Sequence, residues 1–481
     1  MAISAATVWR VRPGGNDANG AGYDSSISGA GTDYSQQDAA QLSLTDLVCQ
    51  ASDDATRLKL RSATGGFTSA MIGNAIRILS TGTFTAGYYF IVGYDSTNLV
   101  TLDRSPAGGA DRTGGSGKVG GAAATPWQID DDGNATGNKC VPGNKIYIRG
   151  SGSRYPTTAD YTKSSTYTNV QGDTTSGYVS WIGENGRPRI SMGGNGYVSW
   201  QRGHRAYISL YLTRSAAQAD EGVVSGSGTN VLIYDCVING GDQNGPCLRL
   251  GRANLCIGND IFCHASAPTS GANRRGIVMS GFDVWIGFNR IHHCGDDGIE
   301  FQGTGTALFN VIDHCKGNGI QIVNHSGDNN QIALVGNTID ANEGHGIDIA
   351  SGQATITQIV NNIISNHTGS GKYGVNAAGT TATNDRLLQL VDRNAFYNNT
   401  GHRNGVSAGP NDIDGTDPSY TSASTGDYRI GTALKALGLN VNDFSDASGA
   451  RTFLDIGAMQ REEAGGAGAG GAHIMGGTVV R

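Results

Sequence analysis

The stretches Gly298-Ile299-Glu300-Phe301 and Gly319-Ile320-Gln321-Ile322 decide the fold, because the same short pattern recurs along the chain. Related copies are Gly276-Ile277-Val278-Met279 and Gly346-Ile347-Asp348-Ile349, with a looser copy at Gly374-Val375-Asn376, so the copies recur at intervals of roughly 21 to 28 residues. Within each copy apolar residues alternate with variable ones, which is the period of a β-strand and not of a helix. A repeat of this length suits one coil of three short strands, so the sequence predicts a solenoid.

A second element follows each of these strands and reads Asn-x-Ile. It begins at Asn259, Asn289, Asn310, Asn337 and Asn361. Asparagines that recur once per coil can stack in a ladder, in which each side-chain amide bonds its neighbour in the next coil. Glycines allow the sharp corners between strands. We therefore expect an all-β fold, a right-handed parallel β-helix.

The composition fits one extended solenoid rather than several separate cores. The chain has 481 residues, 75 of them glycine, and 38% are hydrophobic. Four segments are expected: residues 1–42 as the first half of an N-terminal cap, 43–118 as an inserted small antiparallel β module, 119–458 as the β-helix, and 459–481 as a Gly-rich arm.

Charge and targeting signals limit the possible partners. The net charge is −7, so the chain gains nothing from counterion release and we expect no nucleic-acid partner. No apolar run approaches membrane-spanning length, and the N-terminal MAISAATVWRVRPGG has no basic start followed by an apolar stretch. We therefore expect synthesis and folding in a cytoplasm, where the eight cysteines remain thiols.

Several segments resemble a known family. Residues 11–20 (VRPGGNDANG), residues 124–127 (ATPW), the repeated coils and the closing residues 455–458 (DIGA) resemble the pectate-lyase-like β-helix superfamily. The opening, with its insert and residues 31–40 (GTDYSQQDAA), resembles a group of tailed-bacteriophage virion proteins. Many superfamily members cleave acidic polysaccharides and others are inert rods, so the fold alone does not decide the function.

The resemblance implies a structural protein of a tailed-phage virion, most simply a decoration or cement protein on the capsid, made in the host cytoplasm. The major capsid protein or other virion proteins are then the expected partners, and homo-oligomers and a surface glycan are left open. The arm ends in apolar residues that fit docking on a neighbouring subunit, namely Ile474, Met475, Val479 and Val480, and a disordered arm is the alternative. The alternative is a tailspike that binds or hydrolyses host polysaccharide, and a free polysaccharide lyase is a third possibility.

Two acidic patterns are candidates for chemistry. Asp296-Asp297 and Gly344-His345-Gly346 resemble motifs of polygalacturonases, which are inverting glycosidases. The coil at Gly319 separates the two motifs here, and the flanking Asn-Thr-Asp and Arg-Ile-Lys of that family are absent. Asp and Gly also populate turns for backbone reasons, which explains Asp296 and Asp297 without any chemistry.

The register of the strands predicts a second pair of carboxylates. If the isoleucines point inward, one outward face carries Arg249, Val278, Glu300, Gln321, Asp348 and Asn376. Glu300 and Asp348 are then two coils, or ~9.5 Å, apart, which is the upper limit of the spacing in inverting glycosidases. A plain solvated strand face is the alternative, and no catalytic residue is favoured. Glycan contacts on exposed aromatics would involve Trp181, Trp200 and Trp285.

Sulfur and imidazole groups form a third pattern. Cys263-His264, His292-His293-Cys294 and His314-Cys315 follow their Asn-x-Ile elements at matching places, so His should stack on His and Cys on Cys. Adjacent residues of one strand point to opposite faces, so the two stacks do not converge on a zinc ion. Inward thiols acting as small hydrophobes explain the cysteines, and we expect no metal and no cofactor.

Overall fold

The computed structural model describes residues 4–79, 84–130, 140–169, 177–193, 198–200, 203–214, 222–225, 228–241, 243–263, 273–323, 330–350, 355–377, 389–434, 437 and 456–458. The chain divides into two compact units, the first of residues 1–191 and 198–211 and the second of residues 192–197 and 212–481. In the ranges described, no helix has the length and apolar character that crossing a bilayer requires.

A closed antiparallel barrel lies within the first unit, and it confirms the inserted β module. Its strands run in the order β3-β4-β7-β6-β5-β8. Buried Leu47, Phe67, Ile76 and Val100 fill its interior. The barrel extends from Leu42 to Val119, and its strands are β3 (Leu42–Cys49), β4 (Lys59–Ser62), β5 (Ala75–Leu79), β6 (Gly87–Ser96), β7 (Leu99–Leu102) and β8 (Arg112–Val119).

The rest of the first unit consists of short parallel strands and one helical turn, α1 (Pro126–Ile129). The carboxylate of Asp130, the residue after α1, is buried and forms an ion pair with the buried Arg205 guanidinium at 2.5 Å. The same carboxylate accepts a hydrogen bond from the Trp181 indole. The strands are β1 (Val8–Val11), β2 (Gly22–Tyr23), β9 (Lys145–Arg149), β10 (Tyr161–Lys163), β11 (Tyr167–Asn169), β12 (Val179–Glu184), β13 (Arg189–Met192), β14 (Val198–Trp200) and β15 (Arg205–Ile208).

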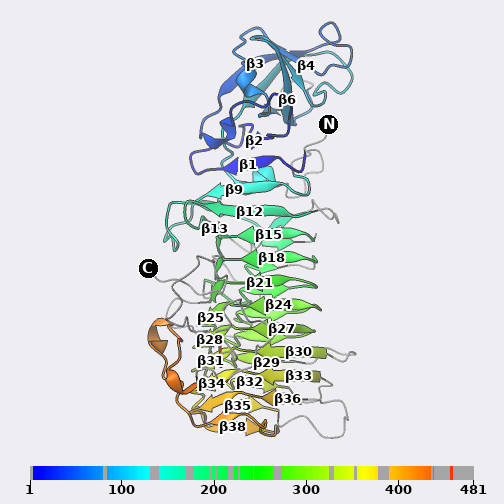
Figure 1. Ribbon diagram of the computed structural model, residues 1–481. Helices are drawn as coiled ribbons and strands as arrows, with labels where there is room; N and C mark the ends of the chain where they lie inside the picture. Colours follow the sequence, from blue (N-terminus) through cyan, green and yellow to red (C-terminus); the bar gives the residue numbers. More distant parts are fainter. Residues whose placement is uncertain are drawn as a thin grey trace, which may run out of the picture. The chain divides into compact units, whose positions relative to one another are not determined.

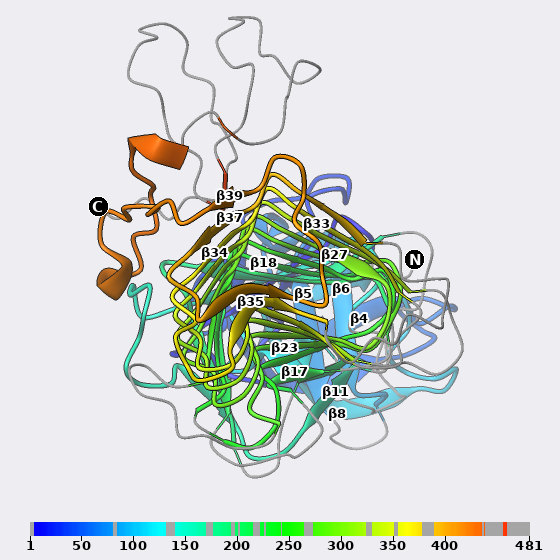
Figure 2. The same ribbon diagram turned by 90° about the horizontal axis from the view of Figure 1, so that it is seen from below.

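The second unit forms coils of three parallel strands, and these stack into three parallel sheets (Figures 1 and 2). This is the predicted right-handed parallel β-helix. Sheet A contains β17 (Val224–Ser225), β20 (Leu248–Leu250), β23 (Ile277–Met279), β26 (Ile299–Phe301), β29 (Ile320–Ile322), β32 (Ile347–Ile349), β35 (Tyr373–Asn376) and β38 (Gly401–Asn404). Sheet B contains β18 (Val231–Tyr234), β21 (Leu255–Ile257), β24 (Val284–Gly287), β27 (Gly305–Leu308), β30 (Asn330–Val335), β33 (Thr355–Val360) and β36 (Gln389–Asp392). Sheet C contains β19 (Val237–Asn239), β22 (Asp260–Phe262), β25 (Arg290–His292), β28 (Val311–Asp313), β31 (Thr338–Asp340), β34 (Ile363–Ser365), β37 (Ala395–Tyr397) and β39 (Ile413–Asp414).

Isoleucines stack along the interior of the second unit. On sheet C they pair in register from coil to coil, and each is fully buried. Burial of an aliphatic side chain contributes roughly 1.5–3 kcal/mol, so such a column is a large part of the core energy. The column consists of Ile261, Ile291, Ile312, Ile339 and Ile364.

A ladder of buried asparagines runs along one edge of this core. In each rung the side-chain oxygen of one asparagine accepts both the backbone and the side-chain N–H of the preceding one, as Asn337 does from Asn310 at 3.0 Å each. The second amide hydrogen of Asn310 bonds the carbonyl of Ile286 at 2.9 Å. The members are Asn259, Asn289, Asn310, Asn337, Asn362 and Asn394, and the series ends at Asp412.

One member differs from the sequence prediction. Asn362, and not Asn361, occupies the ladder. Asn361 has a positive φ of 62° and forms the corner before it. Since asparagine tolerates the left-handed region better than most residues, an Asn-Asn pair satisfies both positions, and the pattern alone does not fix the register.

The repeated glycines also have a different role from the predicted one. Gly298 and Gly319 are not among the positive-φ residues; they are needed because the chain packs closely at these points. A Cβ on Gly319 would lie 2.7 Å from the carbonyl oxygen of Gly346 and 2.3 Å from a methyl carbon of Ile339. The left-handed corners fall elsewhere, for example at Phe309 (φ 52°) and His314 (φ 55°).

A segment from the C-terminal part of the chain covers part of sheet C. Ile430, Leu434 and Ile456 pack on Ile363 and Ala395. The segment includes two short 3₁₀ turns, η3 (Ala423–Thr425) and η4 (Thr432–Leu434). The arm of residues 459–481, with the predicted attachment residues, lies outside the described residues.

Replacing one ladder residue should destabilise the second unit. Asn310→Ala removes the acceptor for Asn289 and the donors to Asn337 and Ile286, leaving buried polar groups unsatisfied at about 1–3 kcal/mol each. We expect a loss of about 3 kcal/mol or more in the free energy of unfolding, measured by chemical denaturation. Asn404→Ala, which removes one half-exposed amide from sheet A, is the control and should cost under about 1 kcal/mol. Equal losses in the two variants would contradict a special role of the ladder.

Candidate functional site

A row of polar side chains follows the outer face of sheet A. Strand pairing places Glu300 beside Gln321, and Gln321 beside Asp348, one coil apart in each case. Glu300 and Asp348 are thus two coils apart, as the pattern predicted, or about 9.5 Å from strand spacing. The polar row consists of Glu300, Gln321, Asp348 and Asn376, and the apolar Val278 precedes it in the same register.

A second column lies beside this row, at the residue that precedes each repeated glycine. Its members are linked from coil to coil through the backbone. The Asp297 carboxylate accepts the backbone N–H of Asn318 at 2.6 Å, and the Asn318 side-chain oxygen accepts the N–H of His345 at 2.8 Å. Together the two columns and Asp296 form what we call the polar face: Arg275, Asp296, Asp297, Glu300, Asn318, Gln321, His345, Asp348, Tyr373 and Asn376.

Asn318 therefore joins the two motifs that the sequence separated. Asp297 and His345 are not in adjacent coils, but both are bonded to the residue between them. His345 Nδ1 accepts the N–H of Tyr373 at 3.0 Å, and the two rings stack with centroids 5.9 Å apart. Burial lowers the pKa of His345, so its imidazole is neutral near pH 7 and that nitrogen is already occupied.

Three carboxylates surround one arginine at the start of the polar face. Arg275 Nε lies 2.7 Å from Glu300, 3.4 Å from Asp296 and 3.9 Å from Asp297. Glu300 and Asp297 are nearly buried, and the Gln302 amide also donates to Glu300. One guanidinium balances one of these charges, so two negative charges would remain if all three acids were ionised.

The pKa of Asp297 reflects both its burial and this excess of negative charge. Burial, and then the neighbouring Asp296 carboxylate, raise the pKa of Asp297 to about 7, against the opposing hydrogen bond from Asn318. Asp297 thus exchanges a proton near neutral pH, which a general acid requires. Carboxyls with raised pKa values are a marker of functional sites.

The far end of the polar face is more accessible. Asp348 is partly exposed and accepts a hydrogen bond from the Asn376 amide at 2.6 Å. The Asn376 oxygen in turn accepts from Asn404 at 2.9 Å. Gln321 accepts from the Asn318 amide at 2.5 Å. This stretch is a continuous set of carboxylate and amide groups with exposed surface.

The tryptophans do not line this face. Trp181 is buried in the first unit against Tyr207 and has no exposed ring face to offer a glycan. Trp285 is 53% exposed but projects from β24 in sheet B. Trp200 belongs to β14, and its side chain is outside the described positions.

The predicted imidazole stack is present. The rings of His293 and His314 are parallel with centroids 5.3 Å apart, and His314 bonds the buried Asp313 carboxylate at 2.9 Å. Burial lowers the pKa of His293 to about 4, whereas the Asp313 bond raises that of His314. Within the ranges described, no three or more His, Cys, Asp or Glu side chains are arranged to hold a metal ion.

The cysteines are buried thiols. All eight are free, and Cys294 and Cys315 occupy matching inward positions. The thiols of Cys247 and Cys263 form a hydrogen bond, with their sulfurs 3.5 Å apart, and no disulfide. His264 lies outside the described residues.

Sequence reasoning missed Arg275 and Asn318 as members of the site. A signal for both exists, because each immediately precedes a repeated glycine, as Asp297 and His345 do. It also missed Tyr420 and Tyr428, whose hydroxyls reach Ser365 and Asp340 on the outer face of sheet C. These tyrosines follow no repeat, so the periodicity held no information about them.

Comparisons with known proteins agree with the fold. A family model described as a right-handed β-helix region matches residues 190–332 and 266–400. Among solved structures, pectate lyase Pel9A aligns over 71% of this chain and 92% of its own, at 14% identity and a TM-score of 0.51. The Dettilon tailspike protein (gp208) aligns over 58% and 63%, at 14% identity and a TM-score of 0.36. No curated protein sequence matches. The family-model match and the stacked parallel sheets make the chain a right-handed parallel β-helix protein, and at 14% identity the likeness to the lyase shows the fold alone.

The raised pKa of Asp297 predicts a pH-dependent stability. A carboxyl whose pKa rises from 3.8 to about 7 on folding stabilises the fold fully below pH 3.8, and this contribution is lost as pH rises through 7. Asp297→Asn cannot ionise, so its stability relative to the unmodified chain should increase between pH 4 and 8, by up to about 4 kcal/mol. Denaturation curves across this range measure the difference. Asp283→Asn, at an exposed position, is the control, and parallel profiles for Asp297→Asn and the unmodified chain would refute the shift.

Proposed function

We propose that the chain binds a polysaccharide along the polar face. The observation that carries this proposal is the unbroken register of hydrogen-bonding side chains over successive coils, from Glu300 to Asn376. Sugar hydroxyls both donate and accept hydrogen bonds, and carboxylates and amides complement them. Repetition at the coil spacing suits a ligand that is itself a repeating chain.

The raised pKa of Asp297 favours a further step, hydrolysis of a glycosidic bond. Protonated Asp297 would give its proton to the glycosidic oxygen as the bond to the anomeric carbon breaks. A second carboxylate would take a proton from the water whose oxygen bonds that carbon. Asp348 is the better second group, because it is partly exposed while Glu300 is paired with Arg275. Asp348 lies two coils from Asp297 and three positions further along its strand, so the two carboxyls are farther apart than two coil spacings alone.

Paired variants test binding and cleavage separately. Neutral and uronate-containing polysaccharides are screened for binding by calorimetry and for cleavage by reducing-end release. Asp297→Asn should retain binding and lower the cleavage rate by about 100-fold or more. Gln321→Ala should weaken binding of the same glycan, and Asp283→Asn should change neither quantity. Absence of binding to every glycan tested, or binding unaffected by Gln321→Ala, would refute a glycan site on the polar face.

We further propose that the chain acts on the surface of a tailed-phage virion, as a capsid decoration protein or a tailspike. The support is the resemblance of residues 11–20 and 31–40 to virion proteins of such phages. The apolar ends of the Gly-rich arm would provide attachment to a neighbouring subunit.

Deletion of residues 464–481 tests the attachment. We expect fewer copies per particle, counted by cryo-electron microscopy of virions, with the thermal unfolding of the purified chain unchanged. Full occupancy after the deletion would contradict attachment through Ile474, Met475, Val479 and Val480. Absence of the chain from virions would contradict the proposed location on the virion surface.

A further inference from the structure

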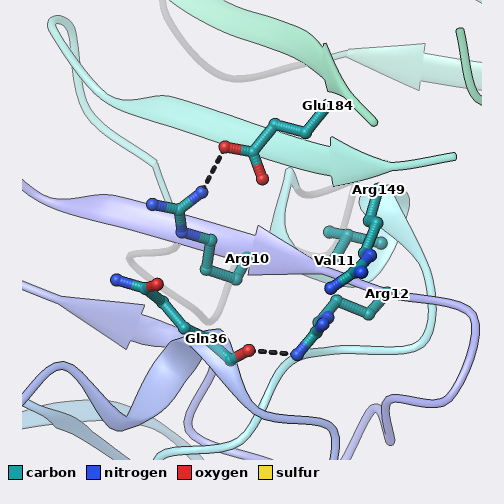
Figure 3. Close-up of a pocket in the computed structure, with 6 residues that line it drawn as sticks. All are labelled: Arg10, Val11, Arg12, Gln36, Arg149 and Glu184. Atoms are coloured by element: carbon teal, nitrogen blue, oxygen red, sulfur yellow. Dashed lines mark hydrogen bonds and ion pairs between the residues drawn. The ribbon is translucent and has the colours of Figure 1, made fainter. Parts of the chain in front are cut away.

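A hollow in the first unit gathers three arginines. It has a volume of about 80 Å³, is open to solvent, and lies where β1, β9 and β12 run side by side (Figure 3). Val11 pairs with Ile148, so Arg12 and Arg149 follow at neighbouring positions, and Arg149 pairs with Glu184 on the next strand. The lining residues are Arg10, Val11, Arg12, Gln36, Arg149 and Glu184.

Two of these arginines already have partners. Arg10 forms an ion pair with Glu184 at 2.5 Å, and its guanidinium lies over the Tyr147 ring at 4.4 Å. Arg12 lies 3.1 Å from the Asp38 carboxylate and donates to the backbone oxygen of Gln36. Each of these positive charges is thus matched by one carboxylate.

Arg149 is the unmatched charge. Among the residues that the structure describes, no group forms a hydrogen bond or an ion pair with its guanidinium. Its side chain points into the hollow toward Arg12 (Figure 3). Arg149 is exposed, so water solvates its charge, and its guanidinium is available to an anion that enters the hollow. Arg10 Nε is also buried without a hydrogen-bond partner.

We propose that this hollow binds an oxyanion, a carboxylate or phosphate group of a small ligand. The guanidinium fork matches both groups with two parallel hydrogen bonds, and such charge-assisted bonds are strong. The hollow's volume of about 80 Å³ is well below the roughly 300–1,000 Å³ of sites that enclose a whole small molecule, so the hollow has room for the oxyanion group alone. All the lining residues belong to the first unit, so the inference is independent of the polar face and its glycan.

The probes are inorganic phosphate, galacturonate and uncharged galactose, titrated against the full-length chain at low ionic strength. We expect saturable binding of phosphate, of galacturonate or of both, and none of galactose. Phosphate alone would identify a phosphate-bearing ligand, and galacturonate alone an acidic sugar. Arg149→Gln should weaken the binding about 10-fold or more, the loss expected for a charge-assisted hydrogen bond.

Lys145→Gln is the matched control, because Lys145 is exposed at the other end of the same strand and does not line the hollow. It removes the same charge and should leave binding unchanged. Equal weakening in both variants would mean that the anion is attracted by the overall positive charge and not by Arg149, and it would overturn the proposal. Failure of both phosphate and galacturonate to bind would overturn it too. Unchanged thermal unfolding of Arg149→Gln shows that a loss of binding is not a loss of fold.

Discussion

The asparagine ladder is the constraint on which the second unit depends. Each rung joins one coil to the next through hydrogen bonds of 2.8–3.2 Å that are buried and mutually satisfied. A strand that slips by one residue turns its apolar side chains outward. Because the ladder joins only equivalent positions, it holds every coil in the same register. The isoleucine column and the polar face both follow from that alignment.

Alignment also concentrates like groups. Stacking brings His293 onto His314 and gathers three carboxylates around Arg275. The molecule responds through proton equilibria, since the pKa of Asp297 rises to about 7 and that of His293 falls to about 4. The pKa shifts thus arise where residues at equivalent positions of the coils are buried and lie close to other ionisable groups.

The sequence contained the parts of the structure that repeat. The Gly-Ile and Asn-x-Ile patterns predicted the strands, the ladder and the spacing of Glu300 and Asp348, because period and register are properties of a single chain read along its length. The contacts that each site makes with residues of other coils or of non-repeating segments were harder to infer. Arg275 reaches Glu300 across a coil boundary, and Tyr428 reaches Asp340 from a non-repeating segment. Burial of Trp181 depends on Asp130, far away in sequence, and no local pattern encodes that contact.

The direction of the ladder has a consequence for its last rung. Each ladder asparagine donates its backbone N–H and one amide hydrogen to the following coil, and its other amide hydrogen to the preceding coil, so a last asparagine would leave the first two donors unused. Asp412 ends the ladder, because one oxygen of its carboxylate accepts from Asn394 and a carboxylate has no N–H to donate to a further coil. Its other oxygen pairs with Arg403 at 2.8 Å. The carboxylate of Asp412 therefore closes the ladder without leaving an unpaired amide at its last rung.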